Sequence, residues 1–150
     1  AGWTVERHVD EFGRTLGEEL LEPTRIYTKP ALAIARETET HAMAHITGGG
    51  LANNLARVMP PELKATLDRG TWTPAPVFDV VRKVGEVAQP DLEATLNCGV
   101  GMVALVAPDA VDAALARLAD FGIDSWVAGE VSVDPAQQGT VELVGQHPGW

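Results

Sequence analysis

Three consecutive glycines, Gly48–Gly50, separate a short apolar run from a helix-like segment, and this succession restricts the fold more than any other stretch of the 150-residue chain. Residues 41–47 (HAMAHIT) are an apolar run of the length typical of a strand in an α/β sheet. After the glycines, apolar residues recur at helical spacing over residues 51–58, and two prolines then end the pattern. The stretch therefore predicts a strand, a tight glycine turn and a helix.

The same alternation continues along the rest of the chain. Residues 101–107 are a continuous apolar run that predicts a strand, and residues 108–122 are the clearest amphipathic helix. The remaining predicted strands are 64–68, 125–132 and 139–145, and the remaining predicted helices are 23–38 with an interruption at Pro30, 75–85 and 90–97. Residues 1–22 are ambiguous, 133–139 are expected to be a surface loop, and the tail 146–150 is expected to be mobile. The predicted fold class is α/β, with a mixed sheet covered by helices in a two-layer sandwich.

Composition restricts the function and the environment of the chain. Its length fits one domain with a real core. Eleven basic against twenty-one acidic residues give a net charge of −10, which disfavours binding to nucleic acid or to an anionic membrane. A single cysteine, Cys98, excludes an internal disulfide and a cysteine zinc site. The single cysteine also favours a reducing compartment, so we expect a cytoplasmic protein. No apolar run reaches the roughly 18 residues of a membrane span.

The glycine turn has two interpretations. It can be a plain tight turn that needs positive φ, or it can present backbone N–H groups to an anion at the start of a helix, with the Thr47 hydroxyl nearby. The Gly-Lys-Ser/Thr ending of a P-loop is missing, so a monophosphate or a sugar phosphate fits better than a triphosphate. Arg25 and Arg57 are candidate anion contacts, because a guanidinium matches phosphate oxygens.

Other motifs have weaker functional interpretations. His41 and His45 lie four apart on a predicted strand, which separates them by about 13 Å, so no shared metal is predicted. His45 is either a polar residue facing the glycine turn or a structural histidine. Residues 97–104 resemble a dinucleotide fingerprint on paper, but a predicted strand follows the glycines where a helix would be needed. Cys98 has no identifiable base, which disfavours a nucleophile.

Four motifs in order resemble one family. They are LLEPTRIY (20–27), HITGGGLANNLARV (45–58), WTPAPVF (72–78) and LNCGVGMV (96–103). Together they resemble the carboxy-terminal part of phosphoribosylformylglycinamidine cyclo-ligase, also called aminoimidazole ribonucleotide synthetase. The resemblance extends over residues 16–131.

The resemblance implies a ligase of purine biosynthesis that closes formylglycinamidine ribonucleotide to aminoimidazole ribonucleotide, with ATP converted to ADP and phosphate. It implies ATP and Mg²⁺ as requirements of the full-length enzyme, a homodimer of two-domain subunits, and an active cleft between the domains. The candidate substrate- or phosphate-binding residues are Thr47, Gly48, Gly49, Gly50, Asn54, Arg57, Asn97, Gly99 and Gly101, with His45, Thr24 and Arg25 as additional candidates. No catalytic residue is assigned.

The chain departs from the family pattern at its beginning. It contains neither the amino-terminal ATP-binding domain nor the segment that opens the second domain in this family, so residues 1–150 are expected to be a single, incomplete carboxy-terminal domain. We expect such a piece to be inactive alone, to bind no cofactor alone, and to associate through unpaired strand edges. Two alternatives remain. One is a related ATP-dependent synthetase, such as formylglycinamidine synthetase, selenophosphate synthetase or thiamine-phosphate kinase, and the other is a non-catalytic ligand-binding or dimerisation module.

Overall fold

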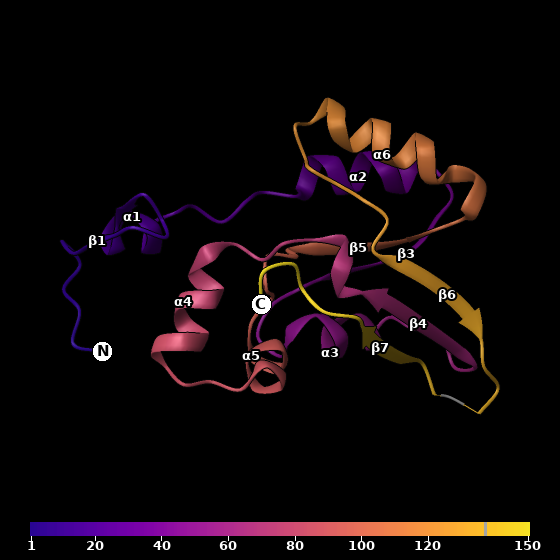
Figure 1. Ribbon diagram of the computed structural model, residues 1–150. Coiled ribbons are helices and arrows are strands. Elements are labelled where there is room, and N and C mark those ends of the chain that lie inside the picture. Colours follow the sequence, from indigo (N-terminus) through magenta and orange to yellow (C-terminus); the bar gives the residue numbers. More distant parts are fainter. Residues whose placement is uncertain (137) are drawn as a thin grey trace.

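The computed structural model describes residues 1–136 and 138–150, which form a main body and a small N-terminal lobe (Figure 1). The lobe contains the short strands β1 (His8–Val9) and β2 (Arg14–Thr15) and the helix α1 (Leu16–Leu20). A capping box begins α1, because the Thr15 hydroxyl accepts from the Glu18 N–H while the Glu18 carboxylate accepts from the Thr15 N–H. Residues 22–27 contain no helix or strand and lead into the body.

The body contains two sheets. In the first, β4 (Leu63–Asp68) lies between β6 (Gly129–Val133), which is antiparallel to it, and β7 (Thr140–Val144), which is parallel to it. In the second, β3 (Thr40–His45) pairs antiparallel with β5 (Met102–Val106). Within the described residues neither of these two strands pairs with a third, so each has one open edge.

Helices cover both sheets. Helix α2 (Thr28–Glu37) packs on β3 and on α6 (Val111–Asp120), above the sheets in Figure 1. Helix α3 (Gly50–Ala56) contacts β3, β7 and α5 (Gln89–Thr95). The remaining helix is α4 (Pro76–Val84), and two short 3₁₀ turns, η1 (Arg69–Thr71) and η2 (Pro108–Ala110), follow β4 and precede α6. No helix in residues 1–136 and 138–150 is both long and apolar enough to cross a bilayer.

The core lies between α3, the two sheets and the segment that follows β4. Its buried members are Ala44, Ile46, Leu51, Leu55, Met59, Ala65, Leu67, Trp72 and Val100. Leu55 has no exposed surface at all. The predicted α/β fold class and its mixed sheet are confirmed.

Two predicted boundaries are wrong for identifiable reasons. Helix α2 begins at Thr28, not at residue 23, and Pro30 lies in its first turn, where a missing N–H removes no helical hydrogen bond and causes no interruption. The predicted strand 125–132 begins only at Gly129, where the backbone of Thr66 approaches so closely that a Cβ would overlap its carbonyl oxygen.

The C-terminal end also differs from its prediction. The tail was expected to be mobile, but His147 is only 3% exposed and its ring lies edge-on against Trp72 and Trp150, at 4.7 Å from each ring. Aromatic packing therefore holds the tail against the body. Of the predicted loop 133–139, Val133 belongs to β6, and residue 137 lies outside the described residues.

Candidate functional site

The glycine turn follows β3 and is fixed by one buried amide. Gly49 and Gly50 have φ of 104° and 73°, and the Gly50 N–H donates to the Thr47 carbonyl at 3.2 Å. Asn54, 4% exposed, donates from Nδ2 to the carbonyls of Thr47 (3.2 Å) and Gly50 (2.7 Å). Its Oδ1 accepts from the Thr47 hydroxyl at 3.3 Å. Asn54 therefore shapes the turn from inside.

The three glycines have different surroundings, and only two of them are required by the structure. Gly50 is buried, and a Cβ there would overlap the Glu93 carbonyl oxygen of α5. Gly49 needs its left-handed φ, and a Cβ there would contact Asn54 and the Arg57 guanidinium at 3.5 and 3.8 Å. Gly48 meets no atom within 4 Å and is exposed. Only Gly48 and Gly49 are therefore accessible to a ligand.

The accessible part of the turn presents hydrogen-bond donors that can bind a ligand. Among the contacts of the described residues, the N–H groups of Gly48 and Gly49 have no internal acceptor. The exposed Arg57 donates from Nη1 to Asn54 Oδ1 at 3.3 Å and forms no ion pair with any described carboxylate. Two backbone donors and one guanidinium therefore lie together, an arrangement that suits a small anion.

The second glycine segment, residues 97–101, lies beside the first because β3 and β5 pair. The Ile46 N–H donates to the Gly101 carbonyl at 2.9 Å. The Gly99 N–H is already bound to Asn97 Oδ1 at 3.1 Å, so it is not a free donor. A Cβ on Gly101 would overlap the Tyr27 hydroxyl, so this glycine lets the Tyr27 ring lie against the backbone.

A groove of about 340 Å³ opens at the end of β3. Its lining residues are Arg25, Ile26, Tyr27, Thr28, Ala31, His45 and Met102. The Tyr27 and His45 rings meet edge to face at 6.2 Å. His45 and Thr47 alternate with the buried Ile46 along the chain, so the groove and the start of the glycine turn lie on one face.

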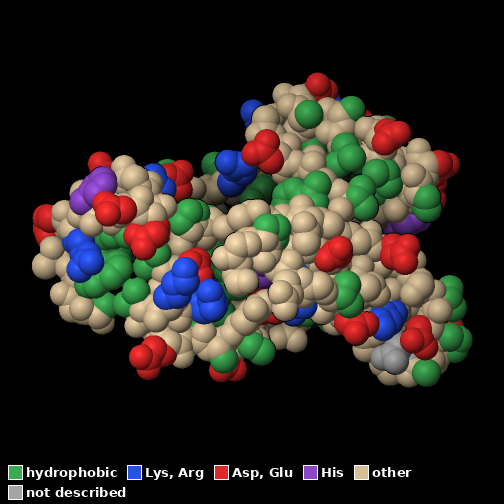
Figure 2. Space-filling model, in the orientation of Figure 1, with side chains coloured by type: hydrophobic (Ala, Val, Ile, Leu, Met, Phe, Trp, Pro, Cys, Tyr) green, Lys and Arg blue, Asp and Glu red, His purple; other side chains and the backbone are tan. Residues whose placement is uncertain are grey.

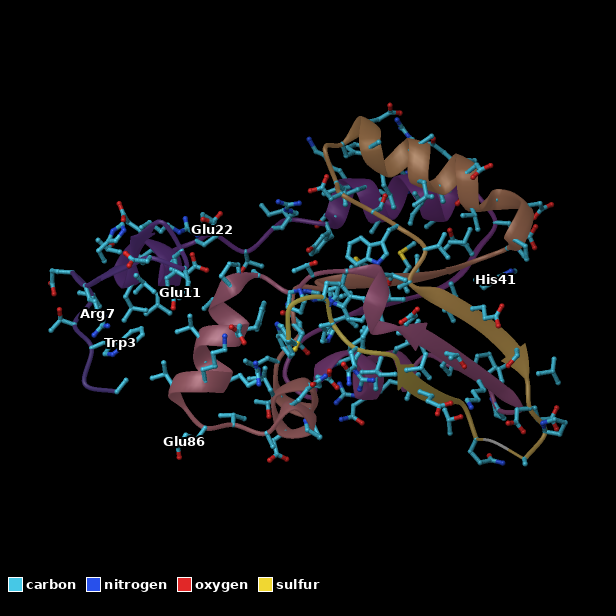
Figure 3. All side chains as sticks on the ribbon, in the orientation of Figure 1. Trp3, Arg7, Glu11, Glu22, His41 and Glu86 are labelled. Carbon is cyan, nitrogen blue, oxygen red and sulfur yellow. The ribbon has the colours of Figure 1, made fainter. Side chains whose placement is uncertain are left out.

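The structure separates the other predicted residues from this face. His41 lies near the start of β3, pointing outward (Figure 3), with Nε2 3.7 Å from the Glu39 carboxylate. Thr24 is exposed and does not line the groove. Cys98 is buried; desolvation, and then the Glu93 carboxylate, raises the pKa of its thiol to about 11. That environment disfavours the nucleophilic thiolate.

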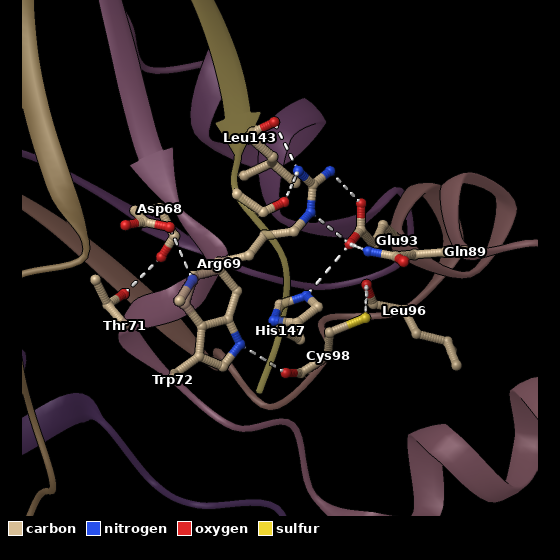
Figure 4. Close-up of polar contacts among 12 residues, drawn as sticks. Asp68, Arg69, Thr71, Trp72, Gln89, Glu93, Leu96, Cys98, Leu143 and His147 are labelled. Carbon is tan, nitrogen blue, oxygen red and sulfur yellow. Dashed lines mark hydrogen bonds and ion pairs between the residues drawn. The ribbon is translucent and has the colours of Figure 1, made fainter. Parts of the chain in front are cut away.

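A buried polar cluster next to the glycine turn was not predicted (Figure 4). Arg69 donates to both carboxylate oxygens of Glu93, at 2.8 and 2.7 Å, and Gln89 donates to the same carboxylate at 2.8 Å. His147 Nε2 lies 3.2 Å from Glu93 Oε1. Arg69 also donates to the Leu143 carbonyl at 2.7 Å.

Burial and charge shift the pKa values in this cluster. Burial acts to raise the pKa of Glu93, but hydrogen bonds from Arg69 and Gln89 outweigh it and leave the pKa below its ordinary value. Burial lowers the pKa of His147, against the opposing influence of Glu93. The residues of the cluster come from η1, α5 and the tail. Arg69 and Glu93 are 24 positions apart, so no local spacing in the sequence predicts that they pair. Only the i, i+4 pair Gln89 and Glu93 carries a sequence signal.

The chain is therefore an α/β domain in which strand β3 is followed by a glycine turn, and a groove lies beside that turn. The family model described as "AIR synthase related protein, C-terminal domain" matches residues 1–142, and the chain belongs to this family.

Named relatives agree with this assignment. The chain is 64% identical over 132 residues to a putative phosphoribosylformylglycinamidine cyclo-ligase of Streptomyces fradiae, which covers 88% of this chain and 72% of the relative. It is 45% identical over 120 residues to the phosphoribosylformylglycinamidine cyclo-ligase of Symbiobacterium thermophilum, covering 80% of this chain and 34% of the relative. It is 46% identical over 118 residues to the phosphoribosylformylglycinamidine cyclo-ligase of Nitrosococcus oceani, and this alignment covers 79% of this chain and 33% of the relative. The chain thus spans about a third of the length of the two latter relatives.

Proposed function

We propose that this chain is the carboxy-terminal part of a phosphoribosylformylglycinamidine cyclo-ligase. The reaction would close formylglycinamidine ribonucleotide to aminoimidazole ribonucleotide, with ATP converted to ADP and phosphate. Membership of the family over residues 1–142 and the names of the relatives support this proposal. In it, an amino-terminal domain completes the cleft, and the enzyme is a homodimer in the cytoplasm.

One observation carries the role of this chain in the reaction: the unpaired N–H groups of Gly48 and Gly49 lie beside the Arg57 guanidinium. We assign them to the phosphate of the ribonucleotide, because backbone donors and a guanidinium both favour phosphate oxygens. They hold the substrate in place while the ring closes, which lowers the entropic part of the barrier. Thr47 adds a hydroxyl at the edge of the same turn.

The remaining candidates have two kinds of role in this proposal. Arg25 and His45 line the groove on the same face and would contact the rest of the substrate. Asn54, Gly50 and the segment 97–101 shape the turn and its surroundings from inside. Thr24 receives no role.

The family also implies ATP and Mg²⁺. Mg²⁺ is held by carboxylate and phosphate oxygens. Among the described residues no three His, Cys, Asp or Glu side chains lie together as a metal site. No residue in the described part of the chain is therefore assigned to the ion.

Titration of the chain with ribose 5-phosphate, followed by ¹H–¹⁵N NMR, tests the phosphate assignment. We expect the amide signals of Gly48 and Gly49 to shift, with a dissociation constant on the order of 1 mM, because one half of a cleft supplies only part of the contacts. Arg57→Gln should weaken this binding severalfold, and Arg36→Gln, on α2, is the matched control. Shifts confined to other residues would refute the assignment. Micromolar binding would instead favour a stand-alone ligand-binding module.

A further inference from the structure

We infer that the buried cluster of Arg69, Glu93 and His147 positions helix α5 and, through it, the glycine turn. Glu93 is thus a positioning residue, and the C-terminal tail contributes to the contacts that hold α5 in place. Whether the position of the turn matters for activity rests on the proposed function, but the coupling between the cluster and the turn is a property of this chain alone. The cluster includes residues beyond 142, where the match to the family model ends.

The first link joins the turn to α5. Gly50 begins α3 with φ of 73°, and its Cα faces the Glu93 carbonyl oxygen so closely that a side chain would overlap it. Leu51, which follows, is 4% exposed, and α3 packs on α5. Close-packed groups of this kind have no space to move independently. A displacement of α5 therefore has to displace the turn.

The second link holds α5 in place. The Glu93 side chain is 9% exposed, and its carboxylate accepts from Nε and Nη2 of Arg69. The third guanidinium nitrogen of Arg69, Nη1, donates to the Leu143 carbonyl near the end of β7. Two-point guanidinium–carboxylate pairs restrict orientation as well as distance. Glu93 thus contacts the turn with its main chain, and its side chain is joined to β7 through Arg69.

The third link is the tail. His147 Nε2 approaches the Glu93 carboxylate to 3.2 Å, and its ring lies edge-on between Trp72 and Trp150. The Trp72 indole N–H donates to the Cys98 carbonyl at 3.1 Å, which joins the same cluster to segment 97–101. Figure 4 shows Glu93 between Arg69 and His147, with Cys98 beside them. The glycine turn and segment 97–101 are therefore both in contact with residues of one buried cluster.

Two variants separate this coupling from general stability. Glu93→Gln keeps the size of the side chain and removes its charge, and His147→Phe keeps the ring between the tryptophans and removes the contact to Glu93. The matched control is Glu37→Gln, which removes the charge from another arginine pair, between α2 and Arg117 of α6. All three are compared well below their melting temperatures, where each is fully folded.

The readout is the ¹H–¹⁵N spectrum of the ligand-free chain, followed by titration with ribose 5-phosphate. We expect Glu93→Gln and His147→Phe to move the amide signals of Gly49, Gly50 and Leu51, to speed hydrogen exchange there, and to weaken ribose 5-phosphate binding at least threefold. Glu37→Gln should change none of these. Should Glu93→Gln fail to fold, His147→Phe decides the question alone.

Folded variants whose turn signals match the wild type would overturn the inference. So would turn signals that move equally in Glu37→Gln. If the wild type does not bind ribose 5-phosphate, the phosphate assignment fails, while the ligand-free spectra still test the coupling.

Discussion

At the scale of single residues, neighbouring glycines of the turn differ in backbone conformation and in the space around them. Gly48 faces open space with an ordinary backbone, whereas Gly50 combines a left-handed φ with direct contact to the main chain of α5. An added methyl group at Gly50 would therefore meet both conformational strain and overlap with a rigid backbone. The same methyl group at Gly48 would meet solvent.

Gly50→Ala should therefore lower the free energy of unfolding by at least about 3 kcal/mol, the sum of a positive-φ penalty and an overpacking penalty. Gly48→Ala, the matched control, should change it by no more than about 0.5 kcal/mol. Urea denaturation followed by tryptophan fluorescence measures both. Equal, small effects would mean that α5 does not approach Gly50 as closely as described.

At the scale of elements, the C-terminal tail and α5 depend on the protonation of two buried groups. Burial lowers the pKa of His147 from its ordinary 6.5, so the unfolded chain binds a proton on this residue at a higher pH than the folded chain does. Acidification from pH 7 through about 6.5 therefore favours unfolding. The pKa of Glu93 lies below its ordinary 4.5, because Arg69 and Gln89 outweigh burial, so a second loss follows below that pH.

We expect the free energy of unfolding to fall as the pH is lowered from 7 towards 5, with His147 contributing a slope of up to about 1.4 kcal/mol per pH unit. His147→Phe should flatten this part of the curve and leave the loss below pH 4.5. His8→Phe is the control, since His8 is exposed in the N-terminal lobe. An unchanged slope in His147→Phe would show that His147 is not protonated preferentially in the unfolded chain.

Elements with a local pattern were predicted well, and elements fixed by distant contacts were not. Strands β3, β4, β5 and β7 and helices α4, α5 and α6 lie where apolar runs or helical spacing placed them. Residues 23–27 do not form the predicted helix: Tyr27 instead lies against Gly101 and His45, far along the chain, and Ile26 is 79% exposed. The glycine turn was recognisable, but the buried role of Gly50 depends on α5, which no local pattern reveals.

At the scale of the whole molecule, apolar side chains remain uncovered on and near the N-terminal lobe. Leu20, Leu21 and Ile26 are 65, 81 and 79% exposed. Figure 2 shows hydrophobic side chains reaching the surface of this lobe and again around α2 and α6. Contiguous exposed apolar surface usually marks a contact with another protein chain.

The isolated chain should therefore self-associate with increasing concentration. Sedimentation velocity should show a rising mean mass for the wild type. The double variant Leu21→Ser with Ile26→Ser should remain monomeric, because it removes the two most exposed of these side chains. Val133→Ser, also at an exposed apolar residue but on β6, is the control. A wild type that stays monomeric at every concentration would contradict this prediction.

The most direct measurement of the proposed function is turnover by a fusion in which residues 1–150, including the C-terminal tail that holds Glu93, replace the corresponding region of the Symbiobacterium thermophilum relative. We expect ATP-dependent formation of aminoimidazole ribonucleotide from formylglycinamidine ribonucleotide. Gly49→Val and Arg57→Gln should each lower kcat/KM at least tenfold, about 1.4 kcal/mol, with an unchanged melting temperature for Arg57→Gln. Gly48→Ala should retain activity. A folded fusion that forms no product, or one that tolerates both Gly49→Val and Arg57→Gln, would contradict the account.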